Sequence, residues 1–500
     1  MRPLTAARCA LWAITAVVWV ALGRLALAFL GNELHWRYVA EQSRRDAPWY
    51  YQLAGVWGGS EGSLLLFAGV LALVASVAAR RLRRPMAIWF ATLTVVGITA
   101  IDLGWVSPFG RLDAPAIRGF GLTPILEHPA MAVHPPLLYL GLGCTLGAAM
   151  VVLDGGVPTA WLRRSLGLVT LAMALGGLWS YVEQGWGGYW AWDPVENTSL
   201  LVWLAAIVSL HLPRWPRLAT LPWVFTLFGA CLVRSGVTPS IHGFAEQASV
   251  GWALLALTLV SCAALWRLSH GAAVSGAGKV SPVPVVAALA VLGLVAAGTA
   301  LPVLIDLFAD RATAVRGVFY SRTVGPVALV TLPFLVLRLR TPRALLAHIG
   351  MVVLVLGIAA TTFDREEVVT VGEGQTQQVA GLAVTGRGVA VEPGPRPDVQ
   401  AVVATVEVDG FVMRPSLVAY PERGGVLAET AMVTRPWRDV QVTLVDATDD
   451  GFARLIVRQR PLMWCVWLGA VLTAVGALSP AWVARRRRRP GEPASAPAAR

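Results

Sequence analysis

The sequence predicts an all-α polytopic membrane protein of about twelve transmembrane helices, with a small extracytoplasmic β-rich domain. Three observations predict this class. Hydrophobic residues make up 56% of the 500 residues and charged residues only 14%, with a mean hydropathy of +0.63. About twelve apolar runs approach the length of a membrane span. One segment near the C-terminus instead combines valine-rich stretches with turn residues, which is typical of strands.

The apolar runs set the number of predicted spans. A helix rises 1.5 Å per residue, so about 20 residues cross hydrocarbon about 30 Å thick. The first run lacks a clear cleavage site of small residues, and we expect it to be a retained span rather than a signal peptide. The runs lie near 9–30, 62–79, 86–103, 134–153, 162–182, 198–212, 219–235, 248–267, 283–306, 323–338, 344–362 and 462–483.

Basic residues orient these spans. Clusters follow the second run (80–84), the tenth (338–343) and the last (485–489), with smaller ones between them. All fall on one side if every run crosses, and Lys and Arg concentrate in cytoplasmic loops. The pattern predicts two cytoplasmic termini and accounts for the net charge of +12 without nucleic acid. Some outer arginines break the bias and either pair with an anionic ligand or, as we expect for most, are solvated: Arg44, Arg45, Arg111, Arg118, Arg311, Arg316 and Arg322.

The chain divides into four parts. Residues 1–362 are predicted to form a transmembrane core, and residues 363–461 the extracytoplasmic β-rich domain. A last transmembrane helix at 462–483 precedes a basic, disordered cytoplasmic tail at 484–500. Within the core, the segment 269–282 is rich in Gly, Ala and Ser, which predicts a flexible cytoplasmic linker.

The cysteines exclude two functions. All five lie inside apolar runs, and no two are arranged as CxxC. A thiol–disulfide role or a metal–thiolate site is therefore not expected. Because no CxxCH occurs, the chain is not itself a c-type cytochrome.

The stretch 179–197, WSYVEQGWGGYWAWDPVEN, is the most unusual part of the sequence. Its glycines and its proline interrupt a regular helix. Trp186, Trp190 and Trp192 are typical of an aromatic belt at the membrane surface. The mixture of Trp, Gly and acidic residues, including Asp193, equally suits a flat platform for a planar ligand. Composition alone does not decide between these two interpretations.

Four of the seven histidines form two pairs once the topology is imposed. His134 and His242 both fall at the outer surface, one on each side of the Trp-rich stretch in sequence. A neutral imidazole is a good axial ligand for haem iron, and their joint position favours ligands over ordinary loop histidines. His35 and His270 are expected to be solvated, and His128 to be solvated or structural.

The inner pair is His211 and His348. His211 lies three residues before Arg214, and His348 five residues after Arg343. Both are therefore expected within about 8 Å of the cytoplasmic boundary, at equal depth. Two ligands to one iron need equal depth, but two interfacial histidines that snorkel explain the same pattern.

Trp186 to Asn197, WGGYWAWDPVEN, resembles the Trp-rich signature of haem-handling proteins of cytochrome c biogenesis, and most closely the CcmF branch. Tyr189 stands where most relatives have Trp. HPPLLY from His134 and VRSGV before His242 are similar to the motifs of that branch that carry its outer histidines, with a departure at Thr238-Pro239. The resemblance runs from about residue 35 to 483 and lacks leading spans of longer members.

The resemblance implies a cytochrome c haem lyase of the bacterial plasma membrane, which forms thioether bonds between haem vinyl groups and a CxxCH apocytochrome c. His134 and His242 would bind the incoming haem, and Trp186, Trp190, Trp192 and Asp193 would shape its platform. His211 and His348 would bind a resident haem b. The implied partners are the haem chaperone CcmE, the thiol-reducing subunit CcmH, the apocytochrome and membrane lipid. The alternatives are a haem exporter or channel of the same superfamily and a non-catalytic assembly scaffold.

Overall fold

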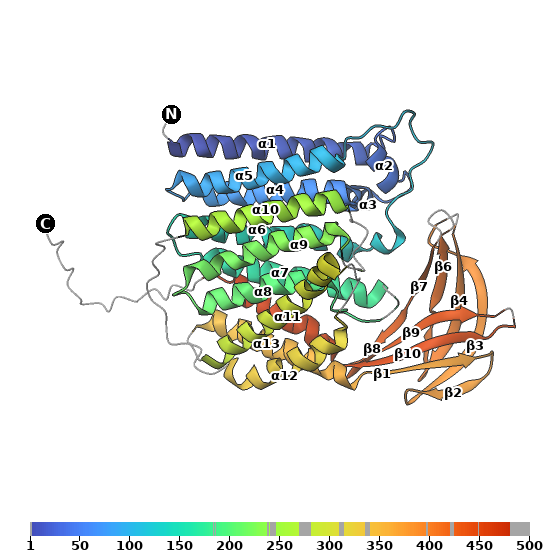
Figure 1. Cartoon of the computed structure of the whole chain (residues 1–500). Coiled ribbons are helices and arrows are strands. Elements are labelled where there is room, and N and C mark those ends of the chain that lie inside the picture. Colours follow the sequence, from blue (N-terminus) through green and yellow to red (C-terminus); the bar gives the residue numbers. More distant parts are fainter. Residues whose placement is uncertain are drawn as a thin grey trace, which may run out of the picture.

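The computed structural model describes most of the chain as a body of parallel and antiparallel helices with a β-domain at one end (Figure 1). His242, His270, Trp186, most of the linker 269–282 and the tail 484–500 lie outside the described residues. The described residues are 3–183, 185, 187–237, 240, 247–269, 282–309, 315–335, 341–396, 399–420, 425–448 and 450–480.

All twelve apolar runs are helices. Among the described residues, ten helices are long and apolar enough to cross a membrane. The other two, of 18 and 16 residues, lie among them. The predicted all-α membrane fold is therefore confirmed. The helices are α1 (Pro3–Leu30), α4 (Ser60–Ala79), α5 (Pro85–Ile101), α6 (Pro129–Leu153), α7 (Thr159–Glu183), α8 (Pro194–His211), α9 (Leu221–Ser235), α10 (Ala248–Leu268), α11 (Pro282–Ala309), α12 (Gly317–Leu335), α13 (Pro342–Ala360) and α14 (Met463–Leu478).

Basic side chains close the helix ends opposite the β-domain. Arg8 donates to the carbonyl oxygens of Ala79 (3.1 Å) and Leu82 (2.9 Å), where α4 ends. Arg163 donates to the carbonyl oxygen of Ala477 at the end of α14 (2.8 Å). The last carbonyls of a helix have no partner within it, and a cation also complements the helix dipole there. Some of the predicted cytoplasmic basic residues therefore also terminate helices.

Among the described residues between α13 and α14, ten strands form two antiparallel sheets. One sheet has the order β1-β10-β9-β8, and the other β2-β3-β4-β6-β7, with β5 beside β4. Their facing side chains form a core that includes Val384, Val442, Leu455 and Val457. The strands are β1 (Arg365–Val371), β2 (Thr376–Val379), β3 (Leu382–Pro393), β4 (Gln400–Val408), β5 (Phe411–Met413), β6 (Ser416–Tyr420), β7 (Gly425–Glu429), β8 (Ala431–Thr434), β9 (Arg438–Ala447) and β10 (Ala453–Pro461).

Helices α13 and α14 meet along glycines. A Cβ on Gly350 would collide with the backbone nitrogen of Thr473 and lie 2.8 Å from the carbonyl oxygen of Gly469. Gly476 is equally close to Ala347, the residue before His348. Small residues let helix backbones approach closely inside a membrane, where dispersion contacts drive association. The glycines therefore set the position of α13, which carries His348.

Candidate functional site

The structure brings the inner histidines together. The ring centroids of His211, at the end of α8, and His348, near the start of α13, are 6.0 Å apart with planes at 78°. Each Nδ1 lies against the carbonyl oxygen four residues earlier, that of Ile207 (2.8 Å) and that of Ala344 (2.7 Å). A carbonyl oxygen only accepts, so each Nδ1 carries the proton and each Nε2 keeps its lone pair.

This donor set fits a metal bound between two imidazoles. Metal–imidazole bonds are about 2 Å long, so two imidazoles on opposite sides of one ion have ring centres roughly 6 Å apart. Neither Nε2 has a hydrogen-bond partner in the part of the chain that the structure describes. The Nδ1–H bonds to backbone also orient each ring, as they commonly do for metal-ligating histidines. The chemistry and spacing therefore suit a haem b.

The outer histidine His134 packs against α7. Its Nδ1 lies 2.7 Å from the carbonyl oxygen of Ala172 and donates to it. Gly176, one turn later, makes room for the ring, because a Cβ there would lie 2.8 Å from Cε1 of His134. Since α7 leads directly into the Trp-rich stretch, His134 is held by the helix that presents that stretch.

Trp192 packs against aromatic rings on two sides. Its ring stacks on Tyr320 of α12, with centroids 4.8 Å apart and planes at 10°, and Trp190 meets it edge-on at 6.1 Å. The backbone of Trp192 is left-handed (φ 58°), and the Asn197 side chain donates to its carbonyl oxygen. One face of Trp192 is therefore covered by Tyr320, a residue that the sequence did not single out. No local pattern marks it, because α12 is far along the chain.

Asp193 begins α8 as its N-cap. Its Oδ1 accepts from the backbone N–H of Val195 (2.8 Å), and Glu196 accepts from the backbone N–H of Asp193 (3.1 Å). This reciprocal arrangement is a capping box. Ser240, two residues before His242, donates to the same Oδ1 at 2.9 Å. Asp193 thus ties the Trp-rich stretch to Ser240.

The ring of Tyr189 packs against α14 and is not part of an exposed aromatic surface. Its ring meets Trp467 of α14 edge-on, with centroids 6.3 Å apart. Burial raises the pKa of Tyr189 to about 12, so the phenol is neutral at physiological pH. Tyr189 therefore anchors the stretch to α14.

Comparison with known proteins agrees with this architecture. Residues 159–234, which include α7, the Trp-rich stretch and His211, match the family described as "Cytochrome C assembly protein". The chain is 31% identical to the probable cytochrome c-type biogenesis protein NrfE of Escherichia coli (strain K12), over 94% of each protein. The chain belongs to the CcmF-type family of cytochrome c assembly proteins. The resemblance inferred from the Trp-rich signature is confirmed.

Two further relatives extend the match. The cytochrome c-type biogenesis protein CycK of Bradyrhizobium diazoefficiens is 28% identical, over 96% of this chain and 92% of CycK. A solved structure titled "Cytochrome c Heme Lyase CcmF" has a TM-score of 0.69 and 22% identity, over 95% of this chain and 91% of that one. This chain therefore shares its fold with that structure over most of its length.

In this member of the family, the β-domain holds the Trp-rich stretch. The carbonyl oxygen of Gly185 accepts from Nη1 of Arg458 (3.2 Å) and from the hydroxyl of Thr443 (3.3 Å). Gln441 donates to the carbonyl oxygen of Tyr181 at 3.1 Å. Arg458 is only 3% exposed. It also pairs with Glu366 at 2.7 Å. The contacts of these side chains on β9 and β10 were not predicted, because the sequence of a strand does not indicate which segment will pack against it.

The same sheet explains why residue 187 is a glycine. A Cβ on Gly187 would lie 2.6 Å from Oε1 of Gln441 and 3.0 Å from Cδ of Arg458. Its φ of 69° also lies in the left-handed region, which favours glycine. A platform for a planar ligand was one of the two interpretations of the stretch, whereas the close neighbour of Gly187 is the β-domain.

Ion pairs connect the outer loops to the β-domain. Glu127 pairs with Arg44 (3.1 Å) and with Arg396 of the β-domain (2.8 Å). The next residue, His128, is the N-cap of α6, where its Nδ1 accepts from the backbone N–H of Ala130 (3.1 Å). Burial lowers the pKa of His128, which favours the neutral ring that a cap acceptor needs. His128 is therefore structural, one of the two readings expected from sequence.

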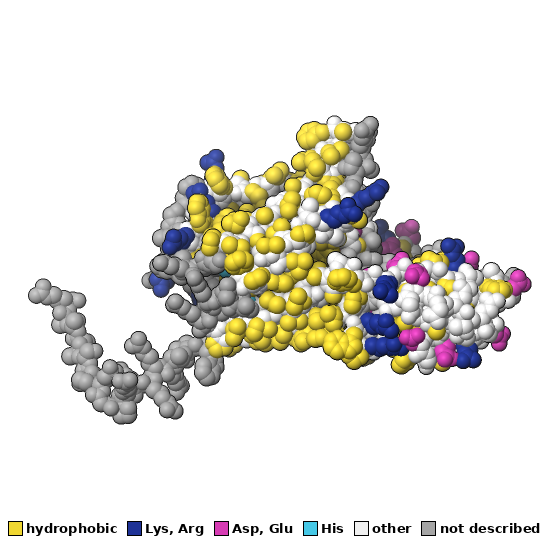
Figure 2. Space-filling view, turned by 90° about the horizontal axis from the view of Figure 1, so that it is seen from below, with side chains coloured by type: hydrophobic (Ala, Val, Ile, Leu, Met, Phe, Trp, Pro, Cys, Tyr) yellow, Lys and Arg dark blue, Asp and Glu magenta, His cyan; other side chains and the backbone are white. Residues whose placement is uncertain are grey.

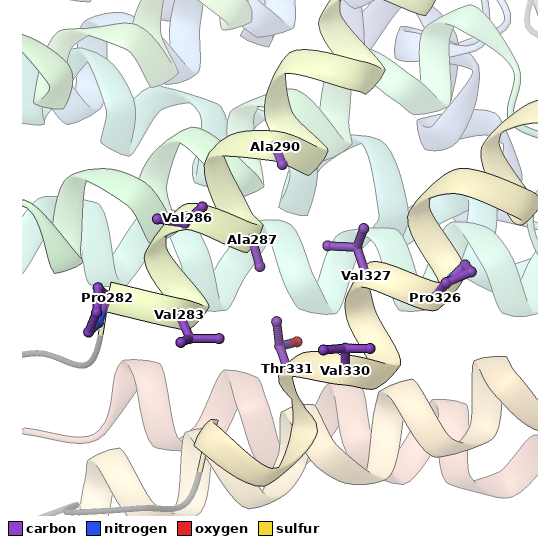
Figure 3. A pocket seen from close by; sticks show the side chains of 9 residues that line it. All are labelled: Pro282, Val283, Val286, Ala287, Ala290, Pro326, Val327, Val330 and Thr331. Atoms are coloured by element: carbon purple, nitrogen blue, oxygen red, sulfur yellow. The ribbon is translucent and has the colours of Figure 1, made fainter.

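An apolar groove of about 630 Å³ lies between α11 and α12 (Figure 3). None of the predicted haem-binding residues that the structure describes lines it. Its walls carry one hydroxyl, that of Thr331, and no charged group. The groove is lined by Pro282, Val283, Val286, Ala287, Ala290, Pro326, Val327, Val330 and Thr331.

Proposed function

We propose that this chain is a cytochrome c haem lyase that binds haem at the outer membrane face and promotes its attachment to a CxxCH apocytochrome c. Membership of the cytochrome c assembly family supports the proposal. The observation that carries it is the packing of His134 on α7, the helix that leads into the Trp-rich stretch. His134 on α6 is thereby held against α7, so that a ligand suited to haem iron lies on the helix pair that leads into the aromatic stretch.

The role of the chain in this reaction is positioning. Thioether formation adds a thiol across a vinyl double bond: sulfur bonds to one carbon, and the thiol hydrogen is transferred to the other. The haem supplies the vinyl groups and the apocytochrome the thiols. His134 and His242 would hold the iron, and Trp186, Trp190 and Trp192 would border the ring. Holding two reactants in alignment supplies a large part of such a barrier reduction.

His211 and His348 would hold a resident haem b near the other end of the bundle. Their matched tautomers and the 6.0 Å ring separation support this assignment. Such a haem supplies electron transfer, which would keep the iron of the incoming haem ferrous. The two residues contribute the ligands and, through their Nδ1–H bonds, the ring orientation.

We place the protein in the bacterial plasma membrane, with both termini cytoplasmic and the β-domain outside. The basic residues at the helix ends opposite the β-domain support this orientation. The partners expected for such a lyase are CcmE, CcmH and the apocytochrome. Cysteine-accessibility labelling at Ser275 and Gly394, after replacement of the exposed Cys9, tests the orientation. Labelling of both positions from the same side would exclude it.

A haem channel of the same superfamily is the second candidate. One observation favours it: His348 lies near the start of α13, whose other end leads into the β-domain, and His211 lies beside it. Haem from the cytoplasm would enter at that end of the bundle. A channel needs His211 and His348 to deliver haem to the outer site, whereas a lyase uses them only to hold the resident haem. If haem supplied from outside restores maturation in the His211→Ala variant, the inner histidines serve the entry of haem from the cytoplasm.

Maturation assays of His134→Ala and His242→Ala test the lyase directly. We expect each variant to lose covalent haem on a reporter cytochrome c while the b-type absorption of the purified protein remains. His35→Ala is the matched control, because His35 is a partly exposed loop residue near Glu33 and outside the proposed site. Normal maturation in the double variant would overturn the proposed mechanism.

A further inference from the structure

Two large aromatic side chains lie where the β-domain joins the helices, and both are largely exposed. Phe363 is 76% exposed and Trp437 is 77% exposed. Phe363 ends the short turn Thr361–Phe363, which directly follows α13. The carbonyl oxygen of Trp437 accepts from the backbone N–H of Leu462 (3.1 Å), the residue before α14. Both aromatic residues therefore lie at the level where α13 ends and α14 begins.

The apolar surface below them is continuous. Few of the described residues of α12 and α13 are buried: Tyr320 in α12, and Gly350, Gly357 and Ala360 in α13. In Figure 2 the hydrophobic face of the helices extends up to the β-domain. In a chain that crosses a membrane, apolar helix faces that no other part of the described protein covers are expected to lie against lipid tails. The exposed aromatic groups thus continue a surface whose occupant is already the bilayer.

Arginine side chains lie along the same border. Figure 2 shows Lys and Arg side chains between the apolar helices and the β-domain. By position, Arg365 begins β1, and Arg316 and Arg322 lie at the start of α12; all three are exposed. None of the three has an ion-pair or hydrogen-bond partner among the described residues. Arg460, by contrast, is paired with Asp364. The border therefore presents unpaired cations at the level of lipid phosphates.

We propose that the β-domain rests on the outer leaflet of the bilayer. Phe363 and Trp437 enter the interfacial region, where amphipathic aromatic rings are favoured. Arg316, Arg322 and Arg365 pair with phospholipid phosphates at the same depth. The occupant of this surface is phospholipid, because the surface continues the lipid-facing sides of α12 and α13. This inference does not depend on the lyase activity.

The contact has a structural consequence for the site. Trp437 immediately precedes β9, whose Gln441 and Thr443 hold the Trp-rich stretch. A bilayer contact at the start of β9 fixes the height of that strand above the membrane. The Trp-rich stretch is then set relative to the lipid surface by the β-domain as well as by α7 and α8.

A depth measurement tests the proposal. Single cysteines at Trp437 or Phe363 are introduced into the full chain with Cys9→Ser and Cys262→Ala, since the remaining three cysteines are buried. Each is labelled with an environment-sensitive fluorophore in nanodiscs of phosphatidylcholine and phosphatidylglycerol. Val426→Cys, on β7 and 66% exposed, is the control. We expect quenching by headgroup-level spin-labelled lipid at 437 and 363 to be several-fold stronger than at 426, and iodide quenching to show the reverse order.

A charge series tests the arginines. Combined Arg316→Glu, Arg322→Glu and Arg365→Glu should raise iodide access at position 437, whereas Arg454→Glu, exposed at the other end of β10, should not. Equal iodide access at 437 and 426 in the otherwise unchanged chain would overturn the proposal. Protection of 437 only when another protein co-purifies would also overturn it, since the occupant would then be that protein.

Discussion

Nη1 of Arg458 lies 3.2 Å from the carbonyl oxygen of Gly185, although 273 positions separate the two residues in the sequence. The same guanidinium contacts the Thr443 hydroxyl at 2.8 Å and Glu366 at 2.7 Å. A buried charge is tolerated only when it is paired and hydrogen-bonded, and these three acceptors meet that need. The Trp-rich stretch is therefore partly built by the β-domain, through a backbone carbonyl rather than a side chain.

Replacement of Arg458 by Met should loosen this contact. The variant removes the ion-pair partner of Glu366 and leaves the Gly185 carbonyl with the Thr443 hydroxyl as its remaining donor. The loss costs about 1.5–3 kcal/mol for a hydrogen bond to a charged group. We expect reduced maturation of a reporter cytochrome, with unchanged b-haem absorption. Arg387→Met is the control, since Arg387 pairs with Glu407 on the surface, where such pairs contribute about 0–1 kcal/mol. Equal losses in both variants would argue against a special role for Arg458.

Gly187→Ala should displace the stretch without removing any side chain. The new Cβ would be 2.6 Å from Oε1 of Gln441, in addition to the strain of a left-handed φ. Gly374→Ala carries the strain alone, roughly 1 kcal/mol, because its φ is 74° and nothing lies within 4 Å of its Cβ. Thermal unfolding and maturation of both variants measure the difference. The prediction fails if Gly187→Ala matures cytochromes as well as Gly374→Ala.

Gly350→Ala should reduce binding of haem b. Its Cβ would push α13 away from α14, and overpacking of this kind costs about 1–3 kcal/mol. The shift moves His348 relative to His211. Gly293→Ala in α11 is the control, because its Cβ meets nothing within 4 Å. Haem content per protein, from the reduced absorption spectrum, should fall in the first variant only; an equal content would show that α13 adjusts.

His211→Ala and His348→Ala should each lower the resident haem. Each variant removes one of two axial nitrogens, so a low-spin b-type spectrum should be lost or become high-spin. The measurement is the reduced spectrum of detergent-purified protein, with His35→Ala as the control for loss of a histidine elsewhere. If neither variant changes the spectrum, the inner pair does not bind haem.

The cap of α6 should make stability pH-dependent. Burial lowers the folded-state pKa of His128 below its unfolded value of about 6.5, although Glu183 lies 3.7 Å from its Nε2. Below about pH 6.5 the unfolded state therefore binds a proton that the folded state does not, and the free energy of unfolding falls as pH falls. His128→Asn keeps a cap acceptor without this titration. Thermal unfolding of both proteins across this range should show a smaller pH slope in the variant; equal slopes would exclude His128 as the cause.

Much of this architecture could be predicted from local sequence. Apolar length predicted the helices, because a span must satisfy its backbone within one segment. The equal depth of His211 and His348 followed from their distance to basic residues. The cap formed by Asp193 and Glu196 is a short-range pattern of four residues, and it is visible in the sequence as D-P-V-E. Each of these features depends on residues within a single helix or directly beside it.

Tertiary structure decided what these segments meet. Depth predicts the level of His348, but its place beside His211 depends on how α13 packs along the glycines of α14. Arg458 and Tyr320 belong to the Trp-rich site only because β10 and α12 pack there. Such contacts join residues more than a hundred positions apart, and their energy comes from the fit of two surfaces that no local pattern encodes. The sequence by itself therefore determined the spans, the family and the caps, and packing decided which side chains complete the site.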